Sequence, residues 1–286
     1  MRAINQPQIN FTDVLQTCID SISCDDLTDR LNNIHPQITL AVQDYSQKVT
    51  TADLFQIVPF VGADATIVTG AVTKKELKGL YTFHMVPAKK AARAYYDQLQ
   101  MSAPLHICPF CGFGHVSTLD HYLPKAKFPL LSILPINLVP SCADCNKGKS
   151  SAIAVSKEEQ CLHPYFDQGH FINEQWIFAE VVETSPPMLT FRVESPIHWN
   201  HDDKERIKSH FIDFKLANRF RVQAATEMPV LKGELEYDYS INQNVGVQQA
   251  LERKYLAASA QHVNGWKTAM YQALAQSDWY CSGGFR

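Results

Sequence analysis

The sequence lacks a long hydrophobic run and a hydrophobic leader. Its longest apolar stretch, FPLLSILPINLVP at residues 128–140, is interrupted by three prolines and is too short to cross a bilayer. The first ten residues, MRAINQPQIN, show neither the basic start nor the apolar segment of a secretory signal. We therefore expect a protein that does not enter a membrane and that resides in the cytoplasm.

A strong net charge is also missing. The formal charge of −3 excludes a protein that coats nucleic acid indiscriminately. The charges are unevenly distributed, because residues 74–150 carry ten Lys/Arg against four Asp/Glu, whereas the segments on both sides are acidic. This pattern predicts one confined surface for a polyanion.

Cysteine is present in a pattern that disulfide-rich secreted proteins do not show. Four of the eight cysteines form two pairs with the spacing Cys-x-x-Cys, CPFC at 108–111 and CADC at 142–145. Two such pairs in a cytosolic chain predict a structural tetrahedral zinc site on Cys108, Cys111, Cys142 and Cys145. Reduced cysteines in a core are the alternative, but the turn-forming residues of CPFCG and CADCN argue against it. His106 and His115 could replace a ligand, although their spacing is poorer.

We expect an α+β fold in three regions. Residues 1–104 are predicted to be mostly helical, since Leu27, Leu31, Ile34 and Ile38 recur at helical spacing. The same region holds a capping-box pattern at 73–76 and a helix-like composition at 88–100. Residues 105–160 form a turn-rich zinc-stapled finger, and residues 161–286 form an α+β region.

The C-terminal region contains two predicted strands, QWIFAEVVE at 175–183 and MLTFRVE at 188–194, with a Ser-Pro-Pro turn between them. Two longer helical stretches are expected around 202–226 and 245–276. The sequence shows no internal repeat and no low-complexity tract.

Between and just after the cysteine pairs, polar residues follow in a fixed order. Asp120 and His121 lie in TLDHYLPK, Asn137 lies in LPINLVP, and Asn146 follows the last cysteine. Over roughly residues 105–151 this order resembles the HNH endonuclease family, whose core is a β-hairpin followed by a helix around one catalytic metal. Two departures are that Asn146 stands where histidine is common and that the loop after His121 is long.

The resemblance and the residue chemistry imply the same roles. A neutral histidine is a suitable general base for phosphodiester hydrolysis, and we assign this role to His121. Asp120 and the amide oxygen of Asn146 are expected to bind Mg²⁺ or Mn²⁺, which prefer oxygen ligands. Asp120 and His121 are adjacent residues of an expected strand, so their side chains point to opposite faces. Asp120 would then face the metal and His121 the attacking water. By resemblance, Asn137 bonds backbone across the hairpin loop and fixes His121.

Four lysines near these residues are candidates for phosphate contacts, with a solvated surface as the alternative interpretation. They are Lys125, Lys127, Lys147 and Lys149. Zinc-dependent deamination is excluded, because that chemistry needs a His-x-Glu pair before the first Cys-x-x-Cys, and none precedes CPFC.

The sequence therefore predicts a metal-dependent HNH endonuclease, with DNA as the expected nucleic acid. The alternative is a catalytically silent zinc-finger protein that binds nucleic acid or acts as a scaffold. The segments HPYFD at 163–167 and WYCSGGF at 279–285 resemble those of HNH proteins encoded beside ATPases in phage-defence systems such as Septu. That resemblance implies an ATPase partner and an antiviral role. In HPYFD, His163 and Asp167 could form a ligand pair, but a turn that packs Tyr165 and Phe166 against the finger is favoured.

Overall fold

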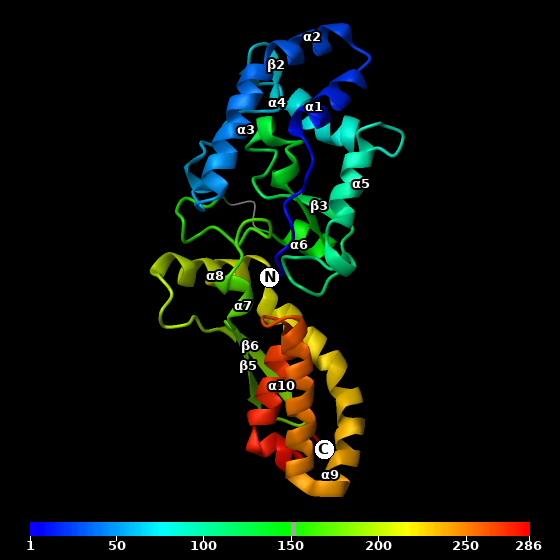
Figure 1. The fold of residues 1–286 in the computed structure, drawn as a ribbon, viewed down its shortest axis with the longest axis vertical. Coiled ribbons are helices and arrows are strands. Elements are labelled where there is room, and N and C mark those ends of the chain that lie inside the picture. Colours follow the sequence, from blue (N-terminus) through cyan, green and yellow to red (C-terminus); the bar gives the residue numbers. More distant parts are fainter. Residues whose placement is uncertain (150–152) are drawn as a thin grey trace. The chain divides into compact units, whose positions relative to one another are not determined.

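The structure is a computed structural model that describes residues 1–149 and 153–286 (Figure 1). It has an α+β fold of helices and small two-stranded antiparallel sheets. The chain forms two compact units. The N-terminal unit consists of Ala3–Pro109 and Gly114–Phe166, and the C-terminal unit of Met1–Arg2, Phe110–Phe113 and Asp167–Arg286.

Helices dominate the first half of the N-terminal unit, as the sequence predicts. The elements up to residue 101 are α1 (Phe11–Asp20), α2 (Asp25–Asn33), α3 (His35–Val49), β1 (Ile67–Thr69), β2 (Val72–Thr73), α4 (Lys74–Gly79), the π-helical η2 (Leu80–Met85) and α5 (Arg93–Met101). The predicted capping box is confirmed, because the Thr73 side chain accepts from the Glu76 N–H and the Glu76 carboxylate accepts from the Thr73 N–H.

Two helix boundaries differ from the sequence expectation. The apolar spacing from Leu27 to Ile38 runs through a break at Ile34, which ends α2 and precedes α3, where Pro36 stands in the first turn. Proline suits the first turn of a helix, because its missing N–H has no partner there. The helix expected from residue 88 begins at Arg93.

A β-hairpin and a short helix complete the N-terminal unit. β3 (Thr118–His121) pairs antiparallel with β4 (Leu138–Ser141), and α6 (Ala143–Gly148) follows and packs on β3. Three-residue 3₁₀ turns lie in this unit at Leu54–Gln56, Pro104–His106, Pro129–Leu131 and Pro135–Asn137. Leu119 and Leu138 of the hairpin belong to the hydrophobic cluster formed by the helices, so the hairpin is fixed on the helical core.

The C-terminal unit is a β-hairpin covered by helices. β5 (Ile177–Val182) pairs with β6 (Met188–Val193), which confirms both predicted strands, and α9 and α10 pack on them. In β6 the buried Leu189 and Phe191 alternate with exposed residues, as expected for a strand with one covered face. The helices of this unit are α7 (His170–Asn173), α8 (His201–Asp213), α9 (Leu216–Gln261), α10 (Trp266–Gln276) and the π-helical η6 (Tyr280–Gly284).

The expected helical stretches of this unit have different limits. The stretch from 202 is divided at Lys215, whose φ of 52° separates α8 from α9. α9 then continues past residue 226, and non-helical angles at Asn242 and Gln243 divide it into two arms. Figure 1 shows these arms, yellow and orange, running antiparallel. Lys254 and Glu234 form an ion pair of 2.6 Å between the arms.

Among residues 1–149 and 153–286, no helix combines the length and the apolar character needed to span a bilayer.

Candidate metal and hydrolytic site

The two Cys-x-x-Cys pairs come together. The sulfur atoms of Cys108, Cys111, Cys142 and Cys145 all lie within 4.8 Å of one another, and all four residues are buried. Cys142 caps α6, and its sulfur accepts from the N–H of Cys145. Four converging thiolates form the donor set of a structural zinc site, so this cluster could bind a zinc ion. His106 and His115 are exposed and do not belong to the cluster.

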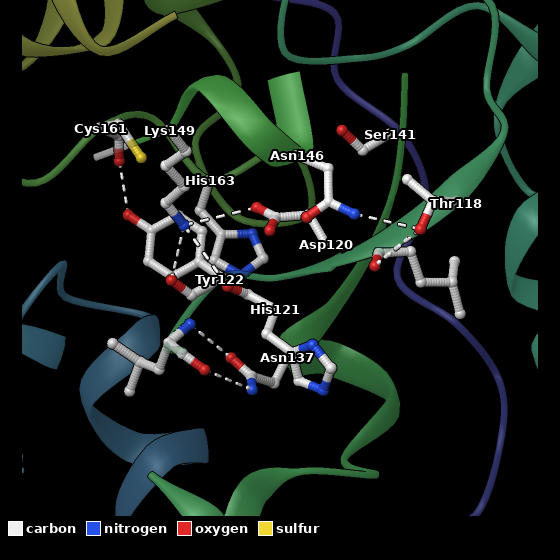
Figure 2. Close-up of polar contacts among 12 residues, drawn as sticks. Thr118, Asp120, His121, Tyr122, Asn137, Ser141, Asn146, Lys149, Cys161 and His163 are labelled. Atoms are coloured by element: carbon white, nitrogen blue, oxygen red, sulfur yellow. Dashed lines mark hydrogen bonds and ion pairs between the residues drawn. The ribbon is translucent and has the colours of Figure 1, made fainter. Parts of the chain in front are cut away.

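The hairpin places Asp120 and His121 on opposite faces of β3, because successive strand residues alternate. Asp120 is on the face of Thr118, whose hydroxyl oxygen accepts from the Asn146 amide nitrogen at 3.1 Å. Since Asn146 belongs to α6, this bond brings the side chain of Asn146 to the face that carries Asp120 (Figure 2). His121 is on the face of Leu119, which points into the helical core.

His121 is buried and firmly oriented. Its Nε2 lies 2.8 Å from the carbonyl oxygen of Ser132, and its ring makes an edge-to-face contact with Tyr81 at 4.5 Å between centroids. A carbonyl can only accept, so Nε2 carries the proton and Nδ1 is the basic nitrogen of the neutral ring. Burial, reinforced by the positive charge of Lys125, lowers the pKa of His121 to about 3. The imidazole is therefore neutral at cellular pH.

Asn137 closes the hairpin loop. Its side-chain oxygen accepts from the N–H of Leu123 at 2.8 Å, and its amide nitrogen donates to the carbonyls of Leu123 and Leu131 at 3.1 and 3.2 Å. Asn137 is fully buried, so these bonds are shielded from water. Because Leu131 precedes Ser132, Asn137 supports the carbonyl that orients His121.

Asp120 is a buried carboxylate with spare acceptor capacity. Only 6% of the residue is exposed, and its Oδ2 atom accepts no hydrogen bond from the part of the chain that the structure describes. The nearest cation is the Lys149 ammonium, whose nitrogen lies 3.5 Å from Oδ2. Burial raises the pKa of Asp120, and the positive charge of Lys149 acts in the opposite direction. A buried carboxylate oxygen that accepts no hydrogen bond from the described residues, on the same strand face as an amide side chain, is a donor set that suits a hard divalent cation.

The four lysines differ in their surroundings. Lys127 and Lys147 are exposed, and Lys125 is partly buried with its nitrogen 4.7 Å from the centre of the Tyr81 ring. Lys149 is turned inward: its ammonium donates to the carbonyl of Tyr122 at 2.7 Å and lies 4.7 Å from the centre of the Tyr122 ring. As a phosphate contact, Lys149 would have to leave these partners.

The sequence interpretation did not identify Tyr122 or the carbonyl of Ser132 as residues that support the site. Tyr122 stacks on His163 at 4.2 Å between ring centroids, and its hydroxyl donates to the Cys161 carbonyl (Figure 2). Tyr165 donates to the carbonyl of Leu138 in β4, in line with the favoured view of HPYFD as a turn against the finger. Asp167 instead pairs with Arg206. The aromatic residues around His163 were a visible signal in the sequence. The carbonyl of Ser132 has no sequence signal, because every residue supplies a main-chain carbonyl.

Comparisons with known proteins give a relative but no activity. No family model and no solved structure match the chain. The chain is 32% identical over 296 residues to protein ea31 of Escherichia phage lambda, in an alignment that covers 99% of this chain and 100% of ea31. Because the alignment spans both proteins from end to end, the chain belongs to the same family as protein ea31 of Escherichia phage lambda.

Proposed function

We propose that this protein is a metal-dependent endonuclease of the HNH type that hydrolyses phosphodiester bonds, with DNA as the substrate. The observation that carries the proposal is the arrangement around β3. Asp120 and Asn146 share one face, and the His121 ring on the other face is held by Ser132 so that Nδ1 is the basic atom. Four cysteines that could bind zinc lie at the start of the finger and at the start of α6.

In this proposal each residue of the site has one role. His121 Nδ1 accepts the proton of the attacking water while the phosphorus–oxygen bond on the opposite side breaks. Asp120 and Asn146 would hold Mg²⁺ or Mn²⁺, and an ion bound there would supply positive charge to the phosphate. Asn137 fixes the loop that orients His121. Lys125, Lys127 and Lys147 contact neighbouring phosphates, which requires only point charges near the site.

The test is cleavage of supercoiled plasmid DNA and of an RNA of similar length with Mg²⁺ or Mn²⁺. We expect cleavage of the plasmid by the wild-type protein, its loss with a mild chelator, and its return when Mg²⁺ or Mn²⁺ is added. Asp120→Ala, Asn146→Ala and His121→Ala should each reduce the rate by at least about 100-fold, because a positioned base alone contributes on this order.

Retained binding without cleavage by the wild-type protein would favour the silent zinc-finger alternative. Rescue of the chelated sample by zinc alone would contradict the separate hydrolytic cation. The ATPase partner and the antiviral role rest on the HPYFD and WYCSGGF resemblances, and co-purification with an ATPase encoded beside the gene is the experiment that tests them.

A further inference from the structure

Lys149 connects the two elements that carry the proposed cation ligands. It follows α6, which holds Asn146, and its ammonium reaches the end of β3, next to Asp120. Besides the short bond to the Tyr122 carbonyl, the nitrogen lies 3.5 Å from the His121 carbonyl oxygen. The ammonium is thus held by main-chain oxygens at the end of the strand and is directed at the carboxylate (Figure 2).

The environment makes this placement stable. The Tyr122 ring lies against Lys149 and also stacks on His163, and His163 Nε2 lies 3.2 Å from the Tyr45 hydroxyl. Only 13% of the Lys149 side chain and 8% of the Asp120 side chain are exposed. Solvent therefore screens the attraction between them weakly.

We propose that the Lys149 ammonium competes with the divalent cation for the Asp120 carboxylate and keeps the affinity for that cation low when no substrate is bound. This inference rests on the proposed function. The argument is electrostatic: two positive charges cannot both lie close to one carboxylate without repelling each other, and here one of them is covalently attached. A phosphate group adds the negative charge that lets both cations remain.

The experiment measures Mn²⁺ binding by the full-length, zinc-containing protein without nucleic acid, from the electron paramagnetic resonance signal of unbound Mn²⁺. Lys149→Met keeps an unbranched apolar side chain against Tyr122, shorter than lysine by the terminal nitrogen, and removes the charge. We expect it to bind Mn²⁺ about tenfold more tightly than the wild type. Lys149→Arg keeps a positive charge and should stay near the wild-type affinity. Lys147→Met is the matched control, since it removes an exposed charge from α6, and it should change the affinity little.

Asp120→Asn distinguishes a failure of the proposed competition from a failure of the proposed cation site. In its background the effect of Lys149→Met should vanish, because the residue for which the cations compete has lost its charge. If Asp120→Asn weakens Mn²⁺ binding but Lys149→Met does not tighten it, the competition is refuted and the proposed cation site stands. If Asp120→Asn leaves Mn²⁺ binding unchanged in both backgrounds, the cation site itself is wrong. The inference is overturned if Lys149→Met binds Mn²⁺ no better than the wild type, or if it binds no measurable Mn²⁺.

Discussion

At the scale of single residues, main-chain carbonyl oxygens hold the side chains of the candidate site: His121 bonds the carbonyl of Ser132, and Lys149 bonds that of Tyr122. The order of Asp120, His121, Asn137 and Asn146 indicates which side chains belong together, and the alternation of a strand indicates that Asp120 and His121 face apart. The partner of His121 was not predictable, because it is the main-chain carbonyl of Ser132. The inward direction of Lys149 also has no sequence signal, since exposed and anchored lysines look alike in a sequence.

Asn137 offers a test at this scale. Asn137→Ala removes the buried hydrogen bonds to the N–H and the carbonyl of Leu123 and one of the bonds to the carbonyl of Leu131, which keeps the N–H of Leu134. We expect the free energy of unfolding to fall by about 2–4 kcal/mol, measured by urea denaturation. Asn146→Ala is the control, because Asn146 is only partly buried and its amide nitrogen donates to Thr118, which is also only partly buried, so its cost should stay below about 1.5 kcal/mol. Equal losses for the two variants would contradict the bracing role of Asn137.

Among the secondary-structure elements, the β5–β6 pair was predicted better than the helix ends, whereas the short β1–β2 pair was not predicted. β6 alternates apolar and polar residues, β5 is rich in aliphatic and aromatic residues, and a Ser-Pro-Pro turn separates them, so both strands and their pairing could be predicted. Helix ends depend on single dihedral angles that apolar spacing does not report. The left-handed Lys215 interrupts a sequence with ordinary helix-forming composition, and the non-helical Asn242 and Gln243 divide α9. At the start of α5, tertiary context overrides the helix-like composition of residues 88–92.

The start of α4 gives an element-scale prediction with a defined pH dependence. Glu76 accepts from Thr73 and pairs with Arg30 at 2.8 Å, and Arg30 chiefly lowers the pKa of Glu76 to about 2 from its ordinary 4.5. Its folded pKa is below its unfolded pKa, so the stabilisation is complete above pH 4.5 and is lost as the pH falls toward 2. Glu76→Gln should therefore lower the free energy of unfolding by about 1–2 kcal/mol at pH 7.

The difference in stability between wild type and Glu76→Gln should shrink as the pH is lowered from 5 toward 2.5, which thermal unfolding at each pH measures. Asp26→Asn is the control, because Asp26 also pairs with Arg30 but its side chain is 76% exposed, so its effect should be at most about 0.5 kcal/mol. If the loss of stability in Glu76→Gln is independent of pH, the lost charge is not its cause.

For the whole molecule, composition and cysteine spacing predicted the α+β class and the convergence of four cysteines. The assignment of segments to compact units was not readable from the chain order. Phe110–Phe113 and Met1–Arg2 belong to the C-terminal unit although most of that unit begins at Asp167. Short inserted segments of this kind carry no compositional boundary, because a unit is defined by contacts that form only on folding.

The cysteine cluster gives a prediction at this scale. We expect one zinc per chain by elemental analysis of the purified protein, and we expect Cys145→Ser to lose the zinc and to unfold the hairpin and α6, because metal binding at such sites supplies folding free energy. Hydrogen exchange of residues 105–149 measures that loss. Cys24→Ser, which changes an exposed cysteine outside the cluster, should keep both zinc and protection. A zinc-free wild-type protein with full protection would sink the zinc assignment.

The bonds of Asn137 also determine where this chain can change in length. One side chain ties Leu123 to Leu131, so the segment at residues 124–130 is a loop pinned at its base. Each doubling of a flexible loop costs only about 0.6 kcal/mol of closure entropy. Insertions at the exposed Ala126 should therefore leave the spacing of His121 and Ser132 intact. This loop is a place where new sequence can be acquired next to the site without rebuilding it.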